Sequence, residues 1–364
     1  MKFQPSVWSQ NPNGPGIGKA EALTLRGFQD GQYNVTFDGI PFGDATDLHH
    51  TTSALFIAHD LQEAQIDRGP GTGSTIGKAT FGGTMGFLSK DPDPVMGIAP
   101  YGTVGSFDTK AYGLELDSGK TPFGSGFVDY QHETTDGYLT HSNERRTNVL
   151  AKYEFQLDDK TTLTVLGTYN HEFQYTTQGA TLAQYAKYGD NYGLCGDPTL
   201  QCYYGYQPSN YYSDFEYARL KTELGPVRVD EMVYTRRLHP QLSGIEGTPA
   251  TTTRPTTAVT FYSPTNIGKK VATYATDIPG KLTKATFRAY GDVLRLSADT
   301  PVGELKTGVW FDEQRDHRWS LTNDLSQGGI PSRPRTARPT ATSTATWPRP
   351  GSPTWNWTGS QSTA

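Results

Sequence analysis

The sequence predicts a mainly β protein whose strands run antiparallel. Apolar and polar residues alternate with a period of two in several runs bounded by turn residues, the pattern of a strand with two different faces. Short turns alternate with long polar segments along the same part of the chain. No stretch approaches the roughly 18 consecutive apolar residues of a membrane-spanning helix. These observations favour strands of the kind that form a transmembrane barrel.

Composition agrees with this fold class. Hydrophobic residues make up 34% of the 364, aromatic residues 12%, and the mean hydropathy is -0.60. A spanning strand alternates lipid-facing and lumen-facing side chains, so its average polarity does not exclude a barrel. The net charge of -5 argues against a nucleic-acid partner.

The first part of the chain predicts a small sheet with tight connections. Asp38-Gly39 supplies two residues that tolerate a positive φ at a hairpin turn, and Pro41 follows with a fixed, extended φ. Glycine recurs between residues 69 and 83, where we expect sharp bends or close approach of another surface. The four expected strands are short apolar runs at 23–25, 33–37, 55–57 and 86–88.

The next part predicts about nine strands. In residues 148–157, Val149, Ala151 and Tyr153 point to one face and Asn148 and Lys152 to the other, so one face meets lipid or core and the other meets water. The nine expected strands are 98–107, 111–116, 126–132, 148–157, 161–170, 215–224, 227–238, 287–296 and 304–312.

The connections between these strands differ in length. Turns at 158–160, 225–226 and 298–301 are short, whereas 173–214 and 239–284 are long and polar. Short turns at one end and long loops at the other are typical of outer-membrane barrels. A secreted β-rich protein with long loops, such as a sugar-binding sandwich, remains an alternative.

The first long loop is rich in tyrosine, and we predict that Tyr203, Tyr204 and Tyr206 bind a planar or amphipathic ligand. The alternative is that such tyrosines pack the loop or form an interfacial girdle. Cys195 and Cys202 are the only two cysteines and predict a disulfide in an oxidising exterior. Two thiols without a nearby histidine do not make a metal site.

The sequence predicts no enzyme, no cofactor and no metal site. Gly77-Lys78 lacks the rest of a phosphate-binding loop, and His132 and His171 each begin a zinc-protease motif that lacks its second histidine. No serine has the glycines of a nucleophile elbow. The adjacent pair His49 and His50 diverges in most backbone conformations, so these two and His59 are not expected to bind a metal.

An ordered set of motifs resembles the plug domain of TonB-dependent outer-membrane receptors. In chain order they are Arg26-Gly27-Phe28, Asp38-Gly39-Ile40-Pro41, Arg68-Gly69-Pro70, Gly77-x-x-x-x-Gly82-Gly83-Thr84 and Ser89-Lys90. Ile76 and Met85-Gly86 depart from the commoner residues. The resemblance is close over the plug and looser to about Trp319. It implies a small α/β plug at 1–95, N-terminally truncated, and the first strands of an incomplete barrel at 96–325.

The resemblance also implies a function and two positioning residues. The parent protein would take up a scarce ligand such as a ferric siderophore, with TonB and outer-membrane lipid as partners. Arg26 and Arg68 match arginines that pair with glutamates of the barrel wall and lock the plug. The start of the chain shows neither a signal peptide nor the TonB coupling box, so we expect the chain to be missing its beginning. A non-functional truncated product is a further alternative.

The composition changes after Asp324. Residues 326–364 contain no acidic residue and no Tyr or Phe, and they are rich in Pro, Thr, Ser and Arg. We predict a disordered or frameshifted tail that adds no strand.

Overall fold

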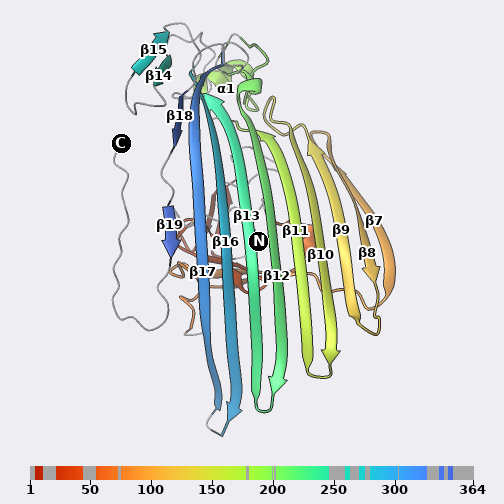
Figure 1. Ribbon diagram of the computed structural model, residues 1–364. Helices are drawn as coiled ribbons and strands as arrows, with labels where there is room; N and C mark the ends of the chain where they lie inside the picture. Colours follow the sequence, from red (N-terminus) through yellow and green to blue (C-terminus); the bar gives the residue numbers. More distant parts are fainter. Residues whose placement is uncertain are drawn as a thin grey trace.

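The chain folds into a large curved sheet, here called the wall, and a small N-terminal domain, here called the plug, which packs against one face of it (Figure 1). The computed structural model describes residues 5–10, 22–43, 55–72, 75–177, 180–198, 200, 202–245, 259–262, 270–274, 279–301, 303–325, 336–339 and 343–346.

Nine long strands form the wall, and each pairs antiparallel with the next long strand along the chain. All nine expected strands are therefore confirmed. Their bounds are β7 Met96–Gly105, β8 Thr109–Ser118, β9 Gly124–Thr135, β10 Glu144–Asp158, β11 Thr161–Tyr175, β12 Pro208–Leu224, β13 Val227–Ile245, β16 Pro279–Thr300 and β17 Gly303–Asp324.

The wall strands are longer than the sequence indicates. β16 and β17 have 22 residues each, about twice the length that a tilted strand needs to cross a bilayer. The backbone pairing continues beyond the residues whose apolar and polar side chains alternate. The connecting loops are therefore shorter than expected, and the second one carries a hairpin of β14 Val259–Tyr262 and β15 Lys270–Tyr274.

The plug is a four-stranded mixed sheet with a separate hairpin. Strand order is β4-β3-β6-β5, with β3 parallel to β6, and β1 pairs with β2. The prediction of a strand at 55–57 is wrong. These three residues are buried in the core, and the strand follows the short 3-10 turn η2 after them. The bounds are β1 Val7–Gln10, β2 Ala22–Leu25, β3 Asn34–Phe37, β4 Ile40–Pro41, η2 Ala58–Asp60, β5 Leu61–Asp67 and β6 Thr84–Ser89.

Two features of the plug backbone match the sequence prediction. Asp38 has a φ of 50° and Gly39 a φ of 83°, as the hairpin turn between β3 and β4 requires. Gly83 has a φ of 117°, and a Cβ there would lie 2.2 Å from the carbonyl oxygen of Asp67. Only glycine permits this close approach of β6 to β5.

One apolar core joins the plug to the wall. The Phe37 ring of β3 packs edge-on against Phe215 of β12, with ring centroids 5.4 Å apart, and stacks on Phe56 at 4.9 Å. Such pairs add about 0.5–1.5 kcal/mol to the effect of burial. The wall contributes Phe127, Leu150, Leu166, Phe215, Tyr217, Met232, Tyr234 and Val293 to this core.

Around this core the alternation of the wall is reversed relative to a soluble sheet. The polar face of β10, β11 and β17 is buried beneath the plug, and the apolar face points outward. The prediction that this polar face meets water is therefore wrong for the part that the plug covers. The buried polar side chains of this face on β9, β10, β11 and β17 include Asp129, Glu144, Arg146, Asn148, Lys152, Asn170, Glu172, Gln174, Asp312, Gln314 and Asp316.

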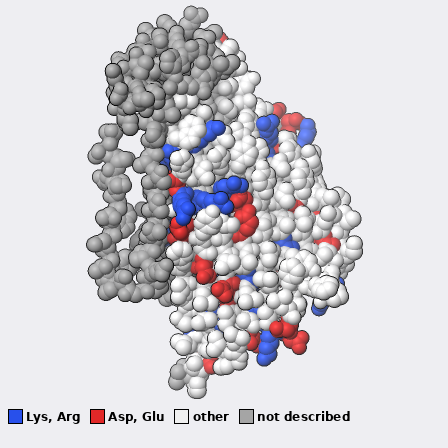
Figure 2. Space-filling model, in the orientation of Figure 1, with Lys and Arg blue, Asp and Glu red and all other residues white. Residues whose placement is uncertain are grey.

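The outward face of the wall is mostly uncharged. Figure 2 shows wide uncharged areas with small groups of acidic and basic side chains between them. Strand register places the ion pairs Arg237–Asp214 and Arg315–Glu313 on this face. Strand register also places the Asp292 carboxylate on this face, between Val233 and Phe311. The exposed apolar side chains of this face include Ile98, Tyr112, Leu114, Leu116, Val128, Tyr130, Val165, Tyr169, Val233, Tyr290, Val309 and Phe311.

Two short strands of the tail, β18 Thr336–Pro339 and β19 Ser343–Thr346, pair with β17. The prediction that the tail adds no strand is therefore wrong for these residues, and the rest of 326–364 lies outside the described part.

The single described α-helix, α1 Leu182–Tyr188, has seven residues. None of the described helices has the length and hydrophobicity needed to cross a membrane.

Candidate functional site

The turn between β3 and β4 carries a buried carboxylate that binds the wall. Asp38 accepts a hydrogen bond at Oδ2 from the Tyr217 hydroxyl of β12, over 2.9 Å. Ser89 of β6 donates to both oxygens of the same carboxylate, through its amide and its hydroxyl, each at 2.8 Å. One carboxylate thus connects two plug strands to the wall. Hydrogen bonds to a charged group contribute more than neutral ones.

Three wall arginines bind main-chain carbonyl groups of the plug. Arg295 donates to the Gly39 carbonyl oxygen at 2.9 Å, Arg236 to that of Gly43 at 2.7 Å, and Arg146 to that of Phe56 at 2.9 Å. These bonds satisfy carbonyl groups at the plug surface and give each guanidinium group a partner in the interface. The wall therefore recognises the backbone of the plug at separate points along its edge.

An ion pair joins the plug to the last long strand. The Lys78 ammonium lies 2.9 Å from Asp312 Oδ2 of β17, and the exposed fractions of the two side chains are 10% and 2%. Asp312 also accepts hydrogen bonds from the Tyr234 hydroxyl at 2.9 Å and from Gln314 at 2.8 Å. A carboxylate this deeply buried needs such partners, because an uncompensated buried charge is strongly unfavourable.

Arg26 and Arg68, which we expected to lock the plug, lie exposed at its edge. Arg26 donates to the carbonyl oxygen of Arg68, and Arg68 donates to that of Pro5 at 3.4 Å. Neither forms an ion pair with a wall carboxylate within the described residues. Their predicted role is neither supported nor contradicted by these contacts.

The 3-10 turn η2 places two titratable side chains against the wall. Asp60 is fully buried, and its Oδ2 accepts a hydrogen bond from the Ile57 amide at 2.9 Å. Burial raises the pKa of the Asp60 carboxyl to about 7, while the bond from Ile57 opposes the shift. His59 beside it lies near Glu115 and Asp129, the one group in the described part of the chain whose side chains could together hold a metal ion. His49 and His50 lie outside the described residues.

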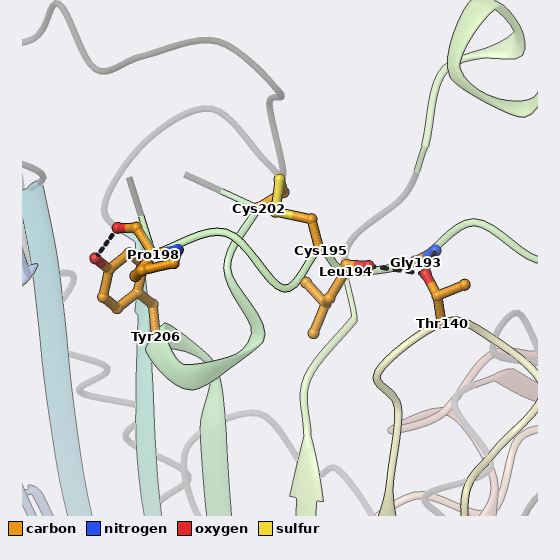
Figure 3. The surroundings of a disulfide bond; sticks show 7 residues. All are labelled: Thr140, Gly193, Leu194, Cys195, Pro198, Cys202 and Tyr206. Carbon is orange, nitrogen blue, oxygen red and sulfur yellow. Dashed lines mark hydrogen bonds between the residues drawn. A yellow bond between two sulfur atoms is a disulfide. The ribbon is translucent and has the colours of Figure 1, made fainter. Parts of the chain in front are cut away.

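The expected disulfide is present in the long loop between β11 and β12. Cys195 and Cys202 are bonded, and the loop is anchored next to them on the β9–β10 connection (Figure 3). The Thr140 hydroxyl donates to the Leu194 carbonyl oxygen at 2.8 Å and accepts from the Gly193 amide at 3.0 Å. The disulfide and these bonds hold one segment of the loop in a fixed position.

The predicted ligand-binding tyrosines form one aromatic cluster on this anchored segment. Tyr204 stacks on His141, with ring centroids 5.0 Å apart and planes 9° apart. Tyr203 contacts both Tyr204 and Tyr206, at 4.9 and 5.0 Å. Tyr206 is buried, and its hydroxyl donates to the Pro198 carbonyl oxygen at 2.5 Å (Figure 3). Tyr203 and Tyr204 remain partly exposed above it.

Solved structures resemble this arrangement. The chain superposes on FpvA, the ferripyoverdine receptor of the Pseudomonas aeruginosa outer membrane, with a TM-score of 0.58. The superposition covers 89% of the residues of this chain, at 14% sequence identity. This is the fold of a TonB-dependent outer-membrane receptor. The siderophore receptor PiuA from Acinetobacter baumannii gives a TM-score of 0.60 at 12% identity over 92% of the chain.

The likeness to these receptors covers only part of them. The chain spans 40% of the FpvA chain and 48% of the PiuA chain. No protein-family model and no curated protein sequence matches it.

The sequence does not reveal most of the side chains that join the plug and the wall. Nothing in the sequence marks Arg146, Arg236 or Arg295, because a main-chain carbonyl partner leaves no sequence signature. The sequence singles out Lys78 only because Gly77-Lys78 resembles part of a phosphate-binding loop. It singles out Asp312 only as the last residue of the expected strand 304–312. The sequence offers one signal for these wall residues. The period-two pattern places each of them on the polar face of its strand.

We predict that Tyr217→Phe loosens the plug in the chain refolded in detergent. The Asp38 carboxylate would lose one of its donors while remaining buried, which costs about 1.5–3 kcal/mol. Hydrogen exchange of the β3–β4 amides, read by mass spectrometry, should accelerate by at least about tenfold. Tyr212→Phe is the matched control, because Tyr212 lies on the same strand and contacts His171 rather than the plug. Equal exchange in both variants would exclude an anchoring role for the Asp38–Tyr217 bond.

Proposed function

We propose that this chain provides the plug and the first barrel strands of a TonB-dependent receptor that takes up a scarce ligand across the outer membrane. The single observation that carries this proposal is the reversed alternation of the wall, with its polar face buried by the plug and its apolar face outward. A soluble sheet buries its apolar face. A barrel in lipid does the opposite, and a plug filling its lumen then covers the polar face.

The ligand is a ferric siderophore or a similar small iron complex. The solved neighbours support this class, because FpvA is described with pyoverdine bound and PiuA is a siderophore receptor. The role is transport and not catalysis. Its partners are outer-membrane lipid and, in the intact parent protein, TonB. Lipid would contact the uncharged areas of the outward face shown in Figure 2.

The ligand would meet the aromatic cluster at the loop end of the wall. Tyr203 and Tyr204 offer partly exposed rings, and Tyr206 supports them from below. Stacked His141 and the disulfide fix the cluster before any ligand arrives. Such preorganisation reduces the entropy lost on binding.

We predict that replacing Tyr203, Tyr204 and Tyr206 together by Ala weakens ligand binding by the full-length receptor. Removing one stacked ring costs about 1 kcal/mol of binding free energy, so affinity should fall by at least roughly tenfold. Titration of ferric siderophores against intrinsic fluorescence measures this. Tyr188→Ala is the control, because Tyr188 lies in the same loop and stacks on Tyr192 instead. Unchanged affinity in the triple variant would assign these tyrosines to loop packing.

A second prediction concerns Arg26 and Arg68, the two arginines expected to hold the plug against the barrel wall. In the full-length receptor, Arg26→Ala and Arg68→Ala should each loosen the plug, because a barrel glutamate would be left buried and unpaired at a cost of about 3–5 kcal/mol. Faster hydrogen exchange in the β1–β2 hairpin and in β5 is the expected result. If exchange there matches the unsubstituted receptor, both arginines are simply solvated at the plug edge.

A further inference from the structure

The contact between η2 and the wall contains an unusual arrangement of charge. Glu115 of β8 and Asp129 of β9 are directly opposite each other in the antiparallel register, on the face that the plug covers. Like charges directly opposite on neighbouring strands are destabilising. Asp129 is fully buried, which makes the repulsion harder for water to screen. The pair therefore requires positive charge close by.

The protein supplies only part of that charge. Lys90 forms an ion pair with Glu115. Asp129 instead accepts hydrogen bonds from the neutral Tyr101 hydroxyl, at 3.0 and 2.9 Å to its two oxygens. Two carboxylates thus face one ammonium group.

His59 lies beside both carboxylates. Its Nε2 is 3.3 Å from Glu115 Oε2 and 3.7 Å from Asp129 Oδ1. This nitrogen atom is buried and makes no hydrogen bond within the described residues. The imidazole ring is held in position by stacking on Tyr101, with ring centroids 4.0 Å apart.

We propose that His59, Glu115 and Asp129 bind a divalent transition-metal cation such as Zn²⁺, which clamps the plug to the wall. One atom from each residue lies within 4.8 Å of the other two. A tetrahedral ion with bonds of about 2.0–2.2 Å places its ligand atoms about 3.3–3.6 Å apart. The Nε2–Glu115 distance of 3.3 Å falls within that spacing, and the Nε2–Asp129 distance of 3.7 Å is slightly longer, so small side-chain movements complete the site.

The surrounding residues fit this role. One imidazole and two carboxylates form a mixed nitrogen and oxygen set that suits Zn²⁺ and leaves a fourth position open. Tyr101 orients both the histidine, by stacking, and Asp129, by hydrogen bonding, as outer partners of metal ligands do. The ion would bridge the plug and two wall strands. The site depends only on the packing of the plug against the wall. It does not depend on which ligand the proposed receptor takes up.

The experiment measures Zn²⁺ binding by the full chain, refolded in detergent and freed of metal with a chelator. Competition with a chromophoric chelator should show one tight site per chain. His59→Phe keeps a ring against Tyr101 but removes the nitrogen, and it should weaken binding at least about 100-fold. His132→Phe is the matched control, because His132 lies on β9 and bonds Thr147 instead. Equal binding by the two variants, or no tight site in the unsubstituted chain, would overturn the proposal.

A further variant changes affinity in the opposite direction. Lys90→Gln removes the ammonium that competes for Glu115, so Zn²⁺ should bind several-fold more tightly. Ca²⁺, which prefers six to eight oxygen ligands, should not displace Zn²⁺. Unchanged or weaker binding by Lys90→Gln, or effective competition by Ca²⁺, would contradict a site built on the His59 nitrogen.

Discussion

The structure depends on how the polar inner face of the wall is satisfied. A sheet whose apolar side chains point outward must direct its polar side chains toward whatever fills its concave side. Burying those groups without partners would cost about 1–3 kcal/mol each. The plug removes part of that cost, because its turn carboxylate, its main-chain carbonyl groups and Lys78 offer partners to donors and acceptors of the wall. Plug and wall are therefore a single cooperative unit.

Plug and wall meet through two kinds of contact. An apolar core around Phe37 includes side chains of both parts, and hydrogen bonds and ion pairs surround it. At the loop end, the disulfide and the Thr140 bonds hold the segment that carries the tyrosine cluster.

The sequence predicts the local features of this fold well. Period-two alternation identified all nine wall strands, Asp38-Gly39 identified the hairpin turn, and the cysteine pair identified the disulfide. Each of these is encoded by neighbouring residues. The strand expected at 55–57 was wrong because a short apolar run can equally serve as a buried bend. The tail strands β18 and β19 form only because β17 offers an unpaired edge, which composition does not reveal.

Residues that meet across long sequence distances could not be predicted. Lys78 and Asp312 come together only once the plug is seated against the wall, and the same holds for His59 with its two carboxylates. The resemblance to a known family directed attention to Arg26 and Arg68 instead, since each is followed by glycine in a motif that the sequence displays. Contacts to main-chain carbonyl groups have no such motif.

The most direct test is a double-mutant cycle on Lys78 and Asp312, because their ion pair links the plug to the farthest long strand of the wall. Plug stability would be measured from the hydrogen exchange of β6 amides in the refolded chain. We expect Lys78→Met and Asp312→Asn each to lower stability by about 3 kcal/mol and the double variant to lose little more than either, because each single change leaves one buried group without its partner. Additive losses, or no loss in either single variant, would contradict the conclusion that buried polar contacts hold the plug against the wall.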